Sequence, residues 1–160
     1  MRVARALVGI AVIPTLLMGV GAGDAFADAG LVTWTNVATN RCLRHNVYTS
    51  LGEVTTGDCT NPYNQWVDSQ NPDGSWDETA WAMLGSTNPY NCLTSYTDNS
   101  VYIEGCNQAS GTNSYERWWE NATQTGWMLQ NVATSRILDS NAAGNVYTLD
   151  SNGGNYQRWT

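Results

Sequence analysis

Four cysteines and one histidine are the residues of this 160-residue chain that are best suited to covalent or metal chemistry: Cys42, Cys59, Cys92, Cys106 and His45. No two cysteines stand at the Cys-x-x-Cys spacing that is typical of zinc sites, and a single histidine cannot complete a ligand set. An even number of cysteines is typical of disulfides in a secreted chain. The sequence therefore predicts two disulfides, with no metal and no cofactor.

Catalytic motifs are not evident. His45 has no serine or cysteine nucleophile marked by a local motif, so we expect it to be a surface residue. A glycosidase needs two carboxylates held at a defined separation across a cleft, and none of the acidic residues forms such a signature. Glycine-rich phosphate loops and cation-binding loops are also missing. We therefore expect a protein that is not an enzyme.

The chain contains three copies of one unit. The segments "NVATNRCL" at 36–43 and "NVATSRIL" at 131–138 agree at six of eight positions, and "STNPYNCL" at 86–93 is a looser copy. Each copy ends in Tyr-x-x-Trp, with Asn, Glu or Gln two positions before the Trp. We expect the three terminal tryptophans, Trp66, Trp118 and Trp159, to meet in one core, and the preceding tyrosines to have a packing role first.

The cysteine positions follow these repeats. Cys92 and Cys106 are 14 residues apart, as are Ile137 and Ser151, which stand at the matching places in the third copy. The third copy has therefore lost both cysteines together. Of the three pairings that are open, this favours the local ones, Cys42–Cys59 and Cys92–Cys106.

Short segments rich in Val, Thr, Tyr and Trp alternate with turn clusters such as "NPDGS" and "SNGGN". No stretch keeps a helical apolar period for long, so the pattern predicts an all-β protein. Three repeats of about 40 residues cannot each hold a core and must share one. We place them at about 31–67, 79–120 and 124–160.

The N-terminal segment has the pattern of a signal peptide. Arg2 and Arg5 precede an apolar run at 6–20, and "AFA" at 25–27 fits a small-x-small cleavage site. We predict a signal peptide at 1–27 and one domain at 28–160, secreted from the cell. The rival interpretation is an uncleaved anchor, but the run is short for a membrane span.

The predicted domain is acidic. Residues 28–160 hold five Arg, no Lys and thirteen Asp or Glu, a net charge of 5 − 13 = −8. Such a surface repels phosphate backbones, which makes nucleic acid an unfavourable partner. It does not favour anionic membranes either, and we expect no membrane insertion.

With "CL" or "IL" early in each repeat and [Gln/Glu/Asn]-x-Trp at its end, the chain resembles the ricin-type β-trefoil lectins over residues 31–160. The resemblance implies a β-trefoil, that is, a six-stranded barrel capped by three hairpins, with a shallow sugar site on each repeat. Sites of this family usually combine an Asp just after "CL", an aromatic platform later in the hairpin, and an Asn three positions before the Trp.

This sequence keeps only part of that pattern. Asp139 stands at the acid position of the third repeat, whereas the first and second repeats have Arg44 and Thr94. The platform positions hold no ring: Gly57, Glu104 and Leu149. The Asn positions hold tyrosines: Tyr63, Tyr115 and Tyr156.

A substitute site is predicted in the third repeat. If Val146 points to the core, Tyr147 points outward and can supply a displaced platform beside Asp139. Asn155 and Tyr156 would complete the site. The alternative is that Asp139 only caps the turn in "DSNAAGN".

The other two repeats are weaker candidates. Tyr102 and Tyr115 would give a weak second site beside Thr94, and the first repeat, with Thr55 and Gly57, would be structural. Trp76, in "PDGSWDE", is expected to be exposed, as an accessory contact for sugar or protein.

The resulting prediction is a secreted carbohydrate-binding lectin module without catalysis, whose partner is a polysaccharide or cell-surface glycan. The alternative is a protein-binding adaptor, such as the targeting subunit of a secreted toxin or enzyme complex. An acidic surface with exposed Trp and Tyr would suit such a protein interface.

Overall fold

The computed structural model describes residues 30–46, 52–81, 91–106 and 113–160. The predicted signal peptide at 1–27 lies outside them. The strands are β1 (Leu31–Val32), β2 (Cys42–Asn46), β3 (Gly52–Gly57), β4 (Trp66–Gln70), β5 (Trp76–Ala80), β6 (Asn91–Ser95), β7 (Val101–Gly105), β8 (Arg117–Thr123), β9 (Gly126–Asn131), β10 (Ile137–Ser140) and β11 (Val146–Leu149). Two short 3-10 helices are η1 (Pro62–Asn64) and η2 (Asn155–Gln157). Over the described ranges, no helix has the length and apolarity to cross a membrane.

A closed barrel is formed by the strands that begin and end the repeats. Antiparallel pairing runs from β1 to β4, β5, β8 and β9 in turn. Trp127 at the start of β9 bridges to Trp159, and Thr35 exchanges backbone hydrogen bonds of 2.7 and 2.9 Å with Thr160. The C-terminal segment therefore fills the gap between the third repeat and the first.

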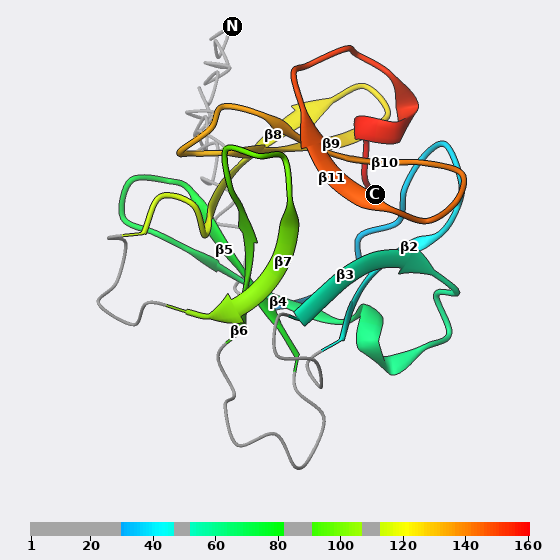
Figure 1. The fold of residues 1–160 in the computed structure, drawn as a ribbon, viewed down its shortest axis with the longest axis horizontal. Coiled ribbons are helices and arrows are strands. Elements are labelled where there is room, and N and C mark those ends of the chain that lie inside the picture. The colour runs from blue at the N-terminus through cyan, green and yellow to red at the C-terminus, as the bar shows by residue number, and fades with distance from the viewer. Residues whose placement is uncertain (1–29, 47–51, 82–90, 107–112) are drawn as a thin grey trace, which may run out of the picture.

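Three hairpins, β2–β3, β6–β7 and β10–β11, form a second layer. Figure 1 shows β3, β7 and β11 converging near the centre of the view, each from a different repeat. β3 pairs with β7, and Thr55 on β3 bridges to Asn145 before β11. A barrel with three such hairpins is a β-trefoil, and the all-β prediction is confirmed.

The tryptophans of the three Tyr-x-x-Trp motifs are each 0% exposed and lie in the shared core. Each donates its indole N–H to the carbonyl of the Leu in the "CL" or "IL" pair of its own repeat. The pairs are Trp66 to Leu43 (3.2 Å), Trp118 to Leu93 (2.9 Å) and Trp159 to Leu138 (3.1 Å). The two recurring motifs are thus joined by one hydrogen bond in every copy.

The "NVAT" motif joins neighbouring repeats. Asn131 donates to the carbonyls of Tyr115 and Arg117, while its oxygen accepts from its own turn at Ala133 and Thr134. Asn36 makes the matching bonds between the first repeat and the third, to the carbonyls of Tyr156 and Arg158. Because both asparagines are 0% exposed, each fixes a turn of one repeat to the Tyr-x-x-Trp segment of another.

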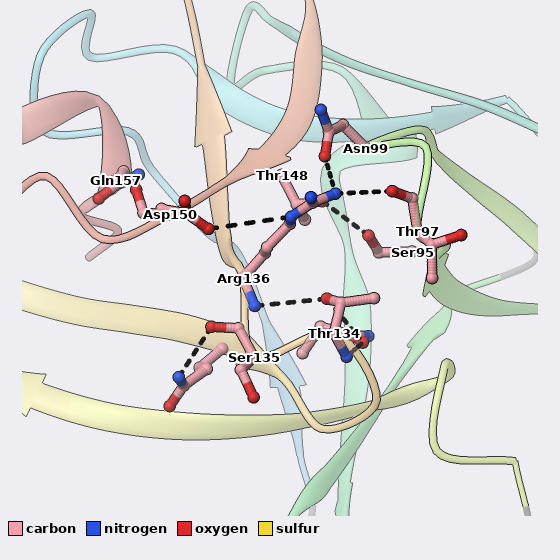
Figure 2. A network of polar contacts seen from close by, with 11 residues as sticks. Ser95, Thr97, Asn99, Thr134, Ser135, Arg136, Thr148, Asp150 and Gln157 are labelled. Atoms are coloured by element: carbon pink, nitrogen blue, oxygen red, sulfur yellow. Dashed lines mark hydrogen bonds and ion pairs between the residues drawn. The ribbon is translucent and has the colours of Figure 1, made fainter.

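An arginine connects the second and third hairpins. Figure 2 shows the Arg136 guanidinium reaching Thr97 and Asn99 on one side and Asp150 on the other. Arg41, at the equivalent place in the first repeat, donates to the carbonyl of Ala142 at 3.3 Å. These contacts fix the turn of each hairpin relative to its neighbour.

Both predicted disulfides are present, Cys42–Cys59 and Cys92–Cys106. In the third repeat, buried Ile137 stands at the place of the first cysteine. Gln157 holds the matching loop by hydrogen bonds to the carbonyl of Asp150 (3.0 Å) and the amide of Asn152 (2.9 Å). Hydrogen bonds therefore secure that loop without a covalent link.

Two expectations about exposure were wrong. His45 is 2% exposed, because it lies two residues after Leu43 on β2 and shares its inward face. Trp76 is 5% exposed, because it begins β5 and alternates inward with Glu78 and Ala80 rather than ending a loop.

Candidate functional site

The third hairpin places Asp139 and Tyr147 directly opposite each other, Asp139 on β10 and Tyr147 on β11. Val146 packs against the core, and Tyr147 and Leu149 alternate outward, as predicted. Asp139 is 2% exposed, so its carboxylate lies at the base of the site. Tyr147 is half-buried and donates its hydroxyl to the carbonyl of Ser140 at 3.1 Å.

Three residues that sequence reasoning did not assign to the site donate hydrogen bonds to the Asp139 carboxylate. Burial raises the pKa of Asp139, and hydrogen bonds from the side chain of Gln157, the amide of Ser140 and the side chain of Asn152 act in the opposite direction. Gln157 is itself 0% exposed. Its recurrence as Asn64 and Glu116 in the other Tyr-x-x-Trp motifs was the signal that could have identified it.

Tyr156 is the exposed ring of the site, at 40% exposure. The equivalent tyrosines are half-buried and contact aromatic neighbours. His45 packs edge-on against Tyr63 at 6.0 Å, and Tyr96 stacks on Tyr115 at 4.8 Å between ring centroids. When the repeats are aligned on their "CL" and "IL" pairs, Ser140 of the third repeat corresponds to His45, and Asn141 corresponds to Tyr96. Both are small side chains. The third repeat therefore has no aromatic neighbour at these two positions to cover its tyrosine, whereas the other two repeats have one each.

Asp139 and Tyr156 both act electrostatically on Tyr147. Burial raises the pKa of Tyr147, and the charges of Asp139 and Tyr156 raise it further. A carboxylate can accept hydrogen bonds from two hydroxyls, and a tyrosine ring offers an apolar face with a polar edge. The arrangement is suited to a small polyhydroxylated ligand with one apolar face.

Asn155, the fourth predicted residue, is not joined to the others. It is exposed at the start of η2, and its side-chain oxygen accepts from the Arg158 guanidinium at 3.5 Å. Over the described residues, no hydrogen bond connects Asn155 to Asp139 or Tyr147.

Asn141, rather than Asp139, caps the turn between β10 and β11. The side chain of Asn141 accepts from the amide of Asn145 at 3.1 Å, and its carbonyl accepts from the amide of Gly144 at 3.0 Å. Asn141 thus closes this turn and leaves the Asp139 carboxylate to the base of the site.

The second repeat forms a stack of three tyrosines. Tyr96, which sequence reasoning missed, lies between Tyr102 and Tyr115, at 5.5 and 4.8 Å. Its hydroxyl donates to Glu104 at 2.8 Å, and this bond, together with burial and the charge of Glu104, raises the pKa of Tyr96 to about 12. Thr94 is 0% exposed and donates to the carbonyl of Cys92. Tyr102 and Tyr115 are therefore brought together, but around another ring rather than a space.

The first repeat has no acidic group at the equivalent place. Arg44 lies against Gly57, where a Cβ would overlap the Arg44 guanidinium. Its cross-strand partner is Thr55, the counterpart of Tyr102 and Tyr147. With His45 filling the adjacent space, this hairpin has a packed surface.

Solved structures with the same fold include both designed and natural proteins. The designed three-fold symmetric protein ThreeFoil superposes with a TM-score of 0.65 at 15% identity, covering 81% of this chain and 95% of that one. SeviL, solved bound to asialo-GM1 saccharide, has a TM-score of 0.61 at 15% identity and coverages of 82% and 94%. The Haemophilus ducreyi cytolethal distending toxin has a TM-score of 0.63 at 11% identity and coverages of 81% and 80%.

These likenesses establish the fold. The chain has a β-trefoil fold of the kind found in lectins, with three pseudo-repeats and two disulfides within repeats. No family model matches the sequence.

Proposed function

We propose that this protein is a secreted, non-catalytic lectin module of the ricin type that binds carbohydrate at the third repeat. The observation that carries the proposal is the exposed ring of Tyr156 together with Asp139 and Tyr147, which lie opposite each other on the paired strands of the third hairpin. The fold is shared with SeviL, whose structure contains a saccharide, which supports the ligand class.

The chemistry of the site supports sugar over other small ligands. A sugar ring presents hydroxyls on one edge and C–H groups on a face. Asp139, already dehydrated by burial, would accept from one sugar hydroxyl at the acceptor position that its three protein donors leave, and Tyr156 would cover the apolar face. The site has one carboxylate at its base, which suits binding, whereas glycoside hydrolysis uses a pair.

The test is a screen of glycans and polysaccharides with the purified protein and two variants. Asp139→Ala is expected to abolish binding to any glycan that the wild-type protein binds in the screen. Asp150→Ala is the matched control, because Asp150 lies just after β11 and its side chain is 99% exposed. Asp150→Ala is expected to leave binding within about twofold of wild type, as is usual for an exposed charge.

Equal binding by wild type and folded Asp139→Ala would remove the third repeat from the proposal. Absence of binding to every glycan by a protein with the native Trp fluorescence would favour the adaptor alternative. That alternative is supported by the shared fold with the Haemophilus ducreyi toxin and by exposed apolar side chains: Leu31, Trp81 and Trp127.

A further inference from the structure

A pocket with a volume of about 360 Å³ opens between barrel strands, away from the third hairpin. Its lining includes Trp34, Asp68, Glu120, Trp127 and Thr160. The volume is at the lower end of the range for small-molecule sites. None of these residues belongs to the Asp139 site, so the pocket is a separate feature of the molecule.

A buried carboxyl pair forms the wall behind this pocket. Glu78 on β5 is 0% exposed, and its Oε2 accepts from the indole N–H of Trp34 at 3.0 Å. Among the described residues, no donor reaches Oε1 of Glu78 or Oε1 of Glu120. Two such oxygens satisfy each other only when one of the carboxyl groups carries a proton.

Glu78 is the group that holds this proton. Burial, followed by the charges of Glu120 and Asp68, raises the pKa of Glu78 well above its ordinary value. Burial also raises the pKa of Glu120, while the hydrogen bond from Glu78 lowers it. The proton therefore resides on Glu78, and Glu120 accepts from it at the pocket wall.

The pocket itself has a negative and aromatic lining. Asp68 lies opposite Glu78 on the paired strand β4 and is 5% exposed. In the parts of the chain that are described, the ion pairs are Arg117–Asp73 and Arg136–Asp150, so no arginine pairs with Asp68 or Glu120. Trp127 adds an indole ring that is 41% exposed. Indole faces attract cations, and a carboxylate beside one adds to that attraction.

We propose that this pocket binds an unacetylated amino sugar, with its ammonium group between the Asp68 and Glu120 carboxylates and its apolar face on Trp127. The inference does not depend on the Asp139 site. The proposal concerns binding alone and includes no glycosidase reaction.

The first test compares glucosamine with N-acetylglucosamine, which has the same ring without the positive charge. With ¹⁵N-labelled protein, glucosamine is expected to shift the indole signals of Trp34 and Trp127 in a saturable manner, and N-acetylglucosamine is expected to leave them in place. Equal shifts with both sugars, or none with either, would overturn the proposal.

The second test locates the binding. Glu120→Gln keeps the acceptor for Glu78 but removes the charge, and should weaken glucosamine binding roughly tenfold, or about 1.4 kcal/mol. Glu53→Gln is the charge-matched control, since Glu53 is exposed on β3 in the hairpin layer. An equal effect of both variants would mean a general loss of negative charge and would contradict the assignment.

Two further variants keep the outcome interpretable. Trp127→Leu changes an exposed ring, so it tests the pocket even if Glu120→Gln does not fold, and it is expected to weaken binding severalfold. Asp139→Ala is expected to leave the glucosamine shifts intact. A loss of these shifts in Asp139→Ala would place the amino sugar at the third repeat and overturn the proposal.

Discussion

His45 lies between Tyr63 and Trp66 as a neutral ring. Its Nε2 is 3.1 Å from the carbonyl of Gln65, so the neutral tautomer must carry its proton there, and burial lowers the pKa of His45 from 6.5 to about 4. Arg44 lowers it further, and the Gln65 hydrogen bond opposes these effects. As the pH is lowered, the unfolded chain therefore takes up a proton at His45 at a higher pH than the folded chain does.

We predict that His45 makes the protein less stable in mild acid. Its contribution is fully present above pH 6.5 and declines as the pH falls towards 4, by roughly 3 kcal/mol in total. His45→Phe should remove this part of the pH dependence. The carbonyl of Gln65 would keep the amide of Trp81 as a donor, at 3.0 Å.

The measurement is urea unfolding at several pH values between 4 and 7.5 for the two proteins. The carboxylates contribute equally to both, so the difference in unfolding free energy isolates His45. A constant difference over this range would show that His45 titrates alike in the folded and unfolded chains.

At the scale of the elements, the "NVAT" turns determine how repeats meet. Asn131→Ala would remove the buried side chain that donates to the carbonyls of Tyr115 and Arg117 and accepts from the amides of the turn after β9, although the amides of Ser95 and Val132 would still reach those two carbonyls. We expect a loss of about 2 kcal/mol in the free energy of unfolding, because each lost hydrogen bond contributes about 1 kcal/mol net and several are lost together.

Asn121→Ala is the control for this measurement, because Asn121 is exposed on β8 and bonds only to the side chain of Gln130. Its expected cost is below about 0.5 kcal/mol. Similar midpoints of chemical unfolding for the two variants would mean that Asn131 does not join the repeats.

The hairpins differ in what covers the Tyr of Tyr-x-x-Trp. His45 in the first repeat and Tyr96 in the second contact that ring, and the third repeat offers only small side chains. Residues of one strand thus decide whether a repeat has a packed or an open surface. This is why the proposed saccharide site is confined to the third hairpin.

At the scale of the whole molecule, Trp159 closes both the barrel and the core. It bridges to Asn36 and Trp127, and its ring is 0% exposed. We predict that Trp159→Ala lowers the free energy of unfolding by about 3–5 kcal/mol, as for other large-to-small core substitutions.

The comparison is Trp127→Ala, measured by chemical unfolding with the disulfides intact. Its ring is 41% exposed, so the expected loss is clearly smaller. Equal losses would contradict the role of Trp159 in the shared core.

The sequence alone determined the repeat, the disulfide pairing and the buried tryptophans. These follow from local chemistry: each recurs in the same register, and a three-fold repeat of short strands can bury its apolar residues only in one shared core. Strand alternation also predicted that Tyr147 points outward, and the strand register then places it opposite Asp139. Asn155 was included as the chain neighbour of Tyr156 but bonds to Arg158 instead.

Only the tertiary structure decided which surfaces are open. The burial of His45, the tyrosine stack at Tyr96 and the Gln157 contact with Asp139 each depend on which side chain from another strand fills a given space. The acidic pocket is lined by Asp68 and Glu120, and Glu78 lies behind them, so three barrel strands contribute one carboxyl group each. Their spacing along the chain carries no sign of this cluster, because it is the closure of the barrel that brings them together.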